Sequence, residues 1–199
     1  MLNIYDVPTA QNTILKRIPL HTKTYPPRLV KSVEALFGKG VTPAGAVSII
    51  LESISQDGDA ALRKWSSLID KTELEDFRIP SADLKAAYKN LDPSLLAALQ
   101  LAVQRIRQFH EHQPLPNWET DKLGGILGQR VTAVEKAGVY VPGGTAPLPS
   151  SLLMSVIPAQ VAGVEQIIVC TPPNPHASIL ACGYLCGIDQ VYQLGGAQA

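Results

Sequence analysis

The sequence has no excess of charge of either sign and no long apolar run. Its 199 residues carry 17 basic and 17 acidic side chains, and neither sign is clustered. A nucleic-acid-binding surface needs a basic face or stripe, so we expect no nucleic acid partner. The apolar stretches are broken well before the roughly 18 residues of a membrane helix, and no basic segment followed by an apolar core opens the chain. We therefore expect a cytoplasmic protein without a membrane partner.

Cysteine and histidine are also scarce. The sequence has three cysteines, which fit reduced thiols better than a disulfide framework. Cys182 and Cys186 are four residues apart, on one face of a helix, but no further Cys or His stands nearby at metal-ligand spacing. The histidines are scattered along the chain: His21, His110, His112 and His176. We therefore predict no metal site, and we interpret the cysteines, Cys170 included, as small buried packing residues.

The first part of the chain, residues 1–136, is predicted to be mainly helical and to form the first portion of a first α/β domain. Prolines interrupt every pattern up to residue 27. Apolar residues at helical spacing follow at residues 28–37. Thr42 before Pro43 is typical of a helix start, and Ser81 is predicted to cap a later helix in the same way.

The most regular helical pattern in the chain follows Asp92 and Pro93, which predict its start. Apolar residues then recur at steps of three and four: Leu95, Leu99, Ala102, Val103, Ile106 and Phe109. Such a stripe is typical of a helix that packs on a core, so we expect these six side chains to be buried.

Extended and helical patterns alternate in the last part of the chain. Strands are predicted at 124–134, 139–141, 166–171 and 190–194, and helices at 151–162 and 176–186. This order predicts an α/β fold with a Rossmann-like parallel βαβαβ unit in residues 137–199, incomplete at its C-terminus. Two right-handed crossovers place both helices on one face of the sheet. The helical N-terminal half or another chain is therefore expected to cover the opposite face.

Between the strand at 139–141 and the next helix, residues 142–149 form a loop rich in glycine and proline, and Ser150 and Ser151 follow it. Glycines let a backbone approach a ligand closely, and a helix N-terminus offers free N–H groups to an anion. The loop therefore fits an anion site, but it equally fits a connection with no ligand. It is not the G-x-G-x-x-G dinucleotide fingerprint.

Several motifs of this region resemble those of histidinol dehydrogenases in order and spacing. They are the run Gly138 to Leu148, Leu153-Met154 and Ile157 to Ala159 in the next helix, Thr171 to Pro173, Leu185 to Gly187, and Gly195 to Ala199. Weaker agreement extends upstream through Gly58 to Leu62 and Phe109-His110. The resemblance covers essentially the whole chain, but only the N-terminal half of the family's usual length.

The resemblance implies an NAD-dependent and zinc-dependent oxidoreductase that converts L-histidinol to L-histidine, through the aldehyde, in histidine biosynthesis. It also implies a homodimer whose active sites draw residues from both subunits. Carried over by position, Tyr140 matches the tyrosine that contacts NAD, and Gln198 matches the glutamine of the Gly-Gly-Ala-Gln-Ala motif that also contacts it. The second domain, with the NAD site, is expected at residues 137–199.

The resemblance places the family's zinc ligands and its catalytic Glu-His pair downstream of the Gly-Gly-Ala-Gln-Ala motif, beyond Ala199. We therefore predict no catalytic residue in this chain, and we expect a truncated histidinol dehydrogenase that is inactive by itself. An alternative is a non-catalytic remnant that binds a nucleotide or acts as a dimerisation or interaction module. A third hypothesis, another NAD enzyme with a thiol nucleophile, would need an activated cysteine.

Overall fold

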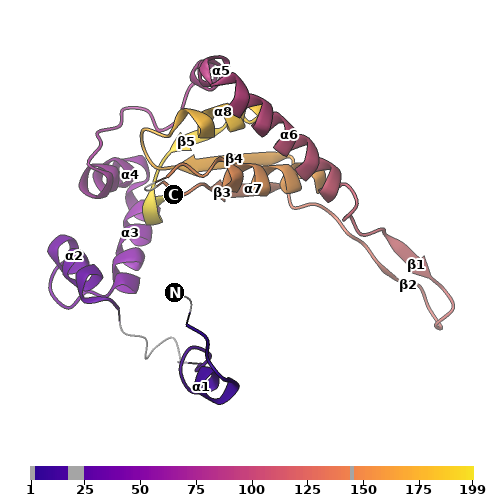
Figure 1. Ribbon diagram of the computed structural model, residues 1–199, viewed down its shortest axis with the longest axis horizontal. Helices are drawn as coiled ribbons and strands as arrows, with labels where there is room; N and C mark the ends of the chain where they lie inside the picture. Colours follow the sequence, from indigo (N-terminus) through magenta and orange to yellow (C-terminus); the bar gives the residue numbers. More distant parts are fainter. Residues whose placement is uncertain (1–2, 18–24, 144–145) are drawn as a thin grey trace. The chain divides into compact units, whose positions relative to one another are not determined.

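The computed structural model describes residues 3–17, 25–143 and 146–199, and the chain divides into two compact units, residues 1–49 and 50–199. The first unit contains α1 (Val7–Asn12), α2 (Pro27–Phe37) and the beginning of α3 (Pro43–Asp57) (Figure 1). No helix within the described ranges is long and apolar enough to cross a membrane. The predicted division at residue 136, which separates two functional parts, stays a prediction.

The helix starts show how local side chains set the boundaries. Thr42 caps α3 as predicted, because the backbone N–H of Gly45 donates to its Oγ1 at 3.1 Å. Asp92 likewise caps α6 (Pro93–His110) by accepting from two backbone N–H groups of the first turn. The predicted role of Ser81 is wrong. It is the first residue of α5 (Ser81–Asn90), and Pro80, which cannot cap through a side chain, occupies the cap position.

The predicted parallel unit is confirmed. Strands β3 (Lys136–Tyr140), β4 (Gln166–Thr171) and β5 (Val191–Gln193) form a parallel sheet in the order β3-β4-β5. Helix α7 (Pro149–Val161) connects the first two strands, and α8 (Ala177–Leu185) connects the last two. The 3₁₀-helix η3 (Gly196–Gln198) follows β5. Residues 77–79 add an antiparallel edge next to β5, where the N–H of Ile79 donates to the carbonyl of Val191 at 2.8 Å.

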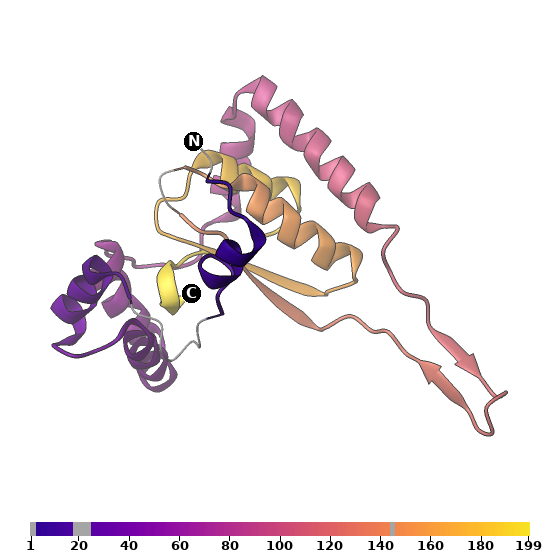
Figure 2. The ribbon, with the colours of Figure 1, turned by 60° about the horizontal axis from the view of Figure 1, so that its bottom comes forward.

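The helices that cover this sheet form two layers on one side of it. Helices α7 and α8 lie against the strands, and α6 and α5 pack on them from outside (Figures 1 and 2). The core joins all three layers through residues that include Leu84, Leu99, Val139, Val141, Leu152, Leu153, Val156, Ile157, Val169, Ile179, Cys182 and Val191. Both crossover helices are thus on the same face, as right-handed connections require.

One of the two expectations was that the helical N-terminal half covers the face of the sheet opposite α7 and α8. For α5 and α6 it is wrong, because they pack on α8 and α7 instead. Helix α8 buries five of its nine residues, so its outer side must also be shielded from water, and α5 provides that cover through Leu84. On the opposite face of the sheet, Tyr140, Cys170 and Tyr192 stand side by side in register and remain partly exposed.

The apolar stripe of α6 is only partly buried, which corrects the prediction for its two ends. Leu99 is buried, and Ala102, Val103 and Ile106 pack against the core. Leu95 and Phe109 are 38% and 64% exposed. The reason is length, because α6 has 18 residues and α7, its main partner, has 13.

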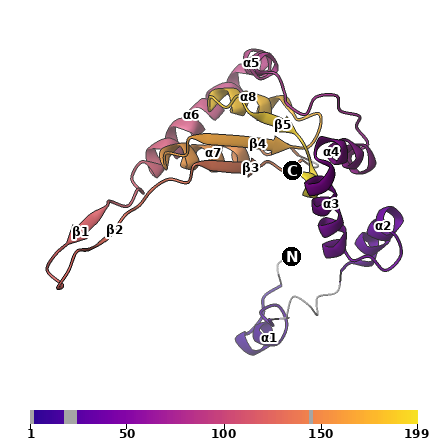
Figure 3. The same ribbon diagram turned by 180° about the vertical axis from the view of Figure 1, so that it is seen from behind.

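Between α6 and β3 the chain forms a two-stranded antiparallel ribbon of β1 (Trp118–Thr120) and β2 (Leu127–Gln129). The predicted strand at 124–134 is therefore real, but only its centre is paired. Every residue from 111 to 136 is exposed apart from Thr120. In Figure 3 the ribbon extends beyond the end of α6, away from the sheet.

Candidate functional site

Three loops meet at the carboxyl end of the parallel sheet, and Pro172, which follows β4, lies between the other two. A Cβ atom on Gly143, after β3, would be 2.8 Å from Cγ of Pro172. A Cβ atom on Gly195, after β5, would be 3.3 Å from Cβ of Pro172. A side chain at Gly143 would force Pro172 to shift, and one at Gly195 would press tightly against it. Ligands of open α/β sheets bind at the carboxyl ends of the strands, so this edge is the candidate site.

The structure brings the two predicted cofactor-binding residues, Tyr140 and Gln198, to this edge. Tyr140 is the last residue of β3 and is 45% exposed, whereas Gln198 is the last residue of η3 and is 5% exposed. Gly196 joins them, because its backbone N–H donates to the Tyr140 hydroxyl at 3.2 Å. With φ at +58°, Gly196 also adopts the left-handed conformation that glycine tolerates best.

A third side chain, Asp70, contacts the site from outside the βαβαβ unit. It ends the π-helix η2 (Ser66–Asp70), which continues α4 (Asp59–Trp65). The Nε2 group of Gln198 donates to Oδ2 of Asp70 at 2.8 Å. Burial raises the pKa of the Asp70 carboxyl, and the hydrogen bond from Gln198 opposes that shift. No sequence pattern pointed to Asp70, because it is 128 residues from Gln198 along the chain.

The other end of the Gln198 amide has no partner within the described part of the chain. Its Oε1 is buried and accepts no hydrogen bond, although buried acceptors are nearly always paired. Gly196 lies directly against this oxygen, since a Cβ atom there would be 2.7 Å from it. The edge thus combines an exposed aromatic ring with a buried acceptor that has no partner within the described ranges. These features fit a ligand that brings a flat group and a hydrogen-bond donor.

A cavity of about 380 Å³ lies beside this edge, between the loops after β3 and β4. It is lined by residues from both loops, among them Gly143, Pro147, Thr171 and His176. Gly144 of the predicted anion loop, and Thr145, lie outside the described residues. Helix α7 begins at Pro149 after Leu148, without a side-chain cap. The anion site therefore stays a prediction.

The cysteines do not have the properties of catalytic nucleophiles. Cys182 and Cys186 are buried, as predicted, and burial raises the pKa of Cys182 to about 12 and that of Cys186 to about 11. Cys170 is only partly buried, on the face of the sheet that α7 leaves open, and burial raises its pKa too. A thiol with a raised pKa is mostly protonated at neutral pH, and the thiolate is the nucleophile. The hypothesis of a thiol-dependent enzyme is therefore not favoured.

The described residues do not bring together a metal-ligand set. No group of three or more His, Cys, Asp or Glu residues in the described ranges could hold a metal ion. His176 is engaged locally, since it caps α8 by accepting from the N–H of Ser178 at 3.2 Å. His21 lies outside the described residues.

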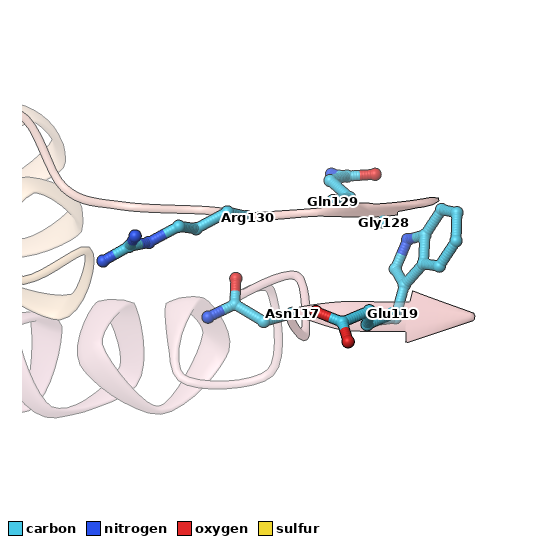
Figure 4. Close-up of a pocket in the computed structure, with 6 residues that line it drawn as sticks. Asn117, Glu119, Gly128, Gln129 and Arg130 are labelled. Atoms are coloured by element: carbon cyan, nitrogen blue, oxygen red, sulfur yellow. The ribbon is translucent and has the colours of Figure 1, made fainter. Parts of the chain in front are cut away.

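A separate hollow of about 490 Å³ lies on the ribbon (Figure 4). Asn117, just before β1, and Glu119 border it on one side. Gln129 and Arg130, which end and follow β2, border it on the other, with their side chains directed away from each other. The Oδ1 atom of Asn117 is already used, because it accepts from the backbone N–H of Val131 at 2.6 Å. All these side chains are exposed, so the hollow lacks the convergent buried polar groups of the sheet edge.

The sequence matches known proteins over most of its length. Residues 40–199 match the family model described as histidinol dehydrogenase. A histidinol dehydrogenase from Sulfurimonas denitrificans is 46% identical over 163 residues, which are 78% of this chain and 38% of that protein. One from Methanosarcina barkeri is 45% identical over 162 residues, which are 78% of this chain and 37% of that protein.

A solved structure shows the same fold. The crystal structure of histidinol dehydrogenase from Elizabethkingia anophelis superposes with a TM-score of 0.75 at 33% identity, and the match covers 92% of this chain and 44% of that one. The chain thus spans less than half the length of the relatives it matches. Because the family model covers most of the sequence, the chain belongs to the histidinol dehydrogenase family.

Proposed function

We propose that residues 137–199 form one wall of the NAD site of a histidinol dehydrogenase, with Tyr140 and Gln198 in contact with the nucleotide. The observation that carries this proposal is the meeting of these two side chains around Gly196, where the Oε1 of Gln198 is buried without a partner among the described residues. The carboxyl edge of a parallel sheet is also where α/β folds bind nucleotides.

The proposed reaction of the complete family enzyme is the oxidation of L-histidinol to L-histidine through the aldehyde. NAD would supply the hydride acceptor for each of the two oxidations, and water would supply the second oxygen of the carboxylate. In this chain, Tyr140 offers an exposed ring on which a flat group can lie, and its hydroxyl accepts from the backbone N–H of Gly196. Gln198 offers an acceptor that fixes a donor group of the nucleotide. These residues therefore bind and orient the cofactor.

We propose that the residues that bind the family's zinc lie outside the described part of this chain. The described part of the chain does not fit zinc, since no three candidate ligands come together in it, and we derive no catalytic step through a metal. Because the chain spans about 38% of its relatives' length, we propose that it does not oxidise L-histidinol by itself. We further propose that the complete protein is a cytoplasmic homodimer.

A calorimetric titration with NAD tests the proposed site. Tyr140→Phe keeps the ring but removes the hydroxyl that accepts from Gly196. Loss of one hydrogen bond should weaken NAD binding roughly three- to tenfold. Tyr184→Phe is the matched control, because Tyr184 lies on α8 against Tyr88, with the ring centroids 4.8 Å apart. Equal affinities in all three proteins, or no NAD binding by the unmodified chain, would overturn the proposal.

The same preparation tests activity. With NAD, zinc and L-histidinol supplied, the chain should form NADH no faster than a sample without protein. Clear turnover would contradict the proposal that residues 1–199 are inactive by themselves.

A second candidate function is that of an interaction module. It is favoured by the open face of the sheet, where Ile168, Cys170 and Tyr192 are only partly covered, and by the exposed apolar residues of the ribbon. Large exposed apolar surfaces usually mark interaction sites. Light scattering separates the candidates, because a module of this kind should self-associate at micromolar concentration without NAD. A monomer that binds NAD would favour the first function.

A further inference from the structure

We propose that Asp70 is a positioning residue, which orients the Gln198 amide so that its nitrogen faces the protein and its oxygen faces the nucleotide. The inference rests on the proposed NAD site and adds to it a residue from a different part of the fold. Asp70 belongs to η2, more than one hundred residues before the loop that it contacts.

The contact joins a charged acceptor to one end of an amide. Oδ2 of Asp70 is 2.8 Å from Nε2 of Gln198, and the Asp70 side chain is half-buried. An amide group carries a donor end and an acceptor end of nearly the same shape, so packing alone does not decide which end faces which way. An ionised carboxylate only accepts hydrogen bonds, and it therefore selects the nitrogen. The oxygen is left on the side of Gly196.

The orientation determines which chemical group the site can bind. Oε1 of Gln198 is buried and unpaired within the described part of the chain, so it is available to accept from a donor that a bound molecule brings. A ribose hydroxyl and a carboxamide N–H₂ are such donors. The reverse orientation would present Nε2 and favour an acceptor, for example a phosphate oxygen. Asp70 thus selects between two kinds of contact without touching the ligand.

The two glycines before Gln198 make this arrangement possible. A Cβ atom on Gly195 would be 3.1 Å from Oδ1 and 3.3 Å from Oδ2 of Asp70. A Cβ atom on Gly196 would be 2.7 Å from Oε1 of Gln198. One glycine therefore admits the carboxylate, and the next admits the amide oxygen, which lies directly against it. The contact between Asp70 and Gln198 therefore explains why two glycines stand in the Gly-Gly-Ala-Gln motif.

The decisive variant is Asp70→Asn. The new side chain keeps the size of aspartate and can still accept from Gln198, so the fold should persist. It can also donate to Oε1, which allows both amide orientations and removes the charge-assisted bond. We expect NAD binding to weaken by about threefold or more, measured by calorimetry. Asp76→Asn, the same change at an exposed carboxylate six positions along the chain, should alter the affinity by less than about twofold.

A double-mutant cycle distinguishes positioning from a general structural effect. If Asp70 acts through Gln198, then Asp70→Asn should have almost no effect on NAD affinity in a Gln198→Ala background. An equal loss in both backgrounds, or unchanged affinity in the single variant, would overturn the inference.

A second measurement needs no nucleotide. The side-chain N–H₂ signals of Gln198 in a nitrogen-15 spectrum, assigned by their loss in Gln198→Ala, should shift strongly in Asp70→Asn and remain in place in Asp76→Asn. Signals unaffected by Asp70→Asn would refute the contact itself. Failure of the unmodified chain to bind NAD would instead refute the proposed function, and these signals would still decide whether Asp70 orients the amide.

Discussion

The parallel sheet and the two-stranded ribbon are both made of paired strands, but only the sheet is covered. In β4, every second side chain is buried, and Val169 is fully shielded. In the ribbon, Trp118, Leu123 and Ile126 are 52%, 71% and 75% exposed. Backbone pairing is therefore common to both regions, whereas burial depends on helices that pack over one of them.

The difference explains where a binding site can form. A two-stranded ribbon is marginally stable on its own, and nearly all the side chains of this one are exposed. Helices α7 and α8 pack behind the sheet edge, and Asp70 beside it accepts a hydrogen bond from Gln198. Side chains that orient a ligand need such support, and the hollow on the ribbon does not provide it.

Removing a large side chain from each region should give the greatest contrast. Leu153 on α7 is 1% exposed, and Leu153→Ala should lower the free energy of unfolding by about 2–5 kcal/mol. Ile126 in the ribbon is 75% exposed, and Ile126→Ala should change it by no more than about 0.5 kcal/mol. Urea unfolding followed by circular dichroism measures both. Similar losses would mean that the ribbon is buried in solution, and the comparison would fail.

A glycine substitution tests the ribbon itself. A Cβ atom on Gly128 would be 2.4 Å from the carbonyl oxygen of Trp118 and 3.1 Å from Cα of Glu119, so Gly128→Ala must push the strands apart. We expect a local cost of about 1–3 kcal/mol, as for overpacking elsewhere. Amide hydrogen exchange in β1 and β2 should then become about tenfold faster, with exchange in the sheet unchanged.

Gly125→Ala is the matched control for this change, since nothing lies within 4 Å of its added Cβ atom. It should leave the exchange rates of the ribbon as they are. If Gly128→Ala also speeds exchange in β3 to β5, the ribbon and the sheet unfold together and are not separate regions.

Local patterns were sufficient to predict most helices and strands of the sheet and its covering helices. The strand at 166–171 was predicted with its observed bounds, because β-branched residues fill it and a Pro-Pro pair ends it. The caps Thr42 and Asp92 were correct because a cap depends on residues within one helical turn. Ser81 failed because the preceding proline took the cap position.

The other misses share a physical cause, which is dependence on residues far away in the sequence. No local signal places α5 and α6 outside α7 and α8, because that choice depends on how much apolar surface α8 leaves uncovered. Tyr140 and Gln198 were named through motif resemblance, and the structure adds that Gly196 connects them. Asp70 could not be found from sequence, since an acidic residue at the end of a helix is ordinarily a solvated one.

The smallest expected effect concerns Asp92, at the start of the outer helix α6. Hydrogen bonds from Ser94 and from the backbone N–H of Leu95 lower the pKa of the Asp92 carboxyl below its ordinary value of 3.8. A lowered pKa means that the ionised cap stabilises the folded state above the ordinary value. This stabilisation is lost as the pH falls through the folded-state pKa, when the carboxylate takes up a proton.

Asp92→Asn keeps a capping side chain but cannot titrate, so it isolates this contribution. The difference in unfolding free energy between the unmodified chain and Asp92→Asn should be constant near neutral pH. Only below a pH of about 3.8 should the unmodified chain lose stability relative to Asp92→Asn. At low pH, amide exchange should become faster in the first turn of α6, which is one of the helices that cover the sheet. It should not change in β1 or β2. The cap acts within one helical turn. If protonation of Asp92 also made amide exchange in β1 and β2 faster, the stability of the ribbon would depend on α6, and the sheet and the ribbon would be coupled through that helix.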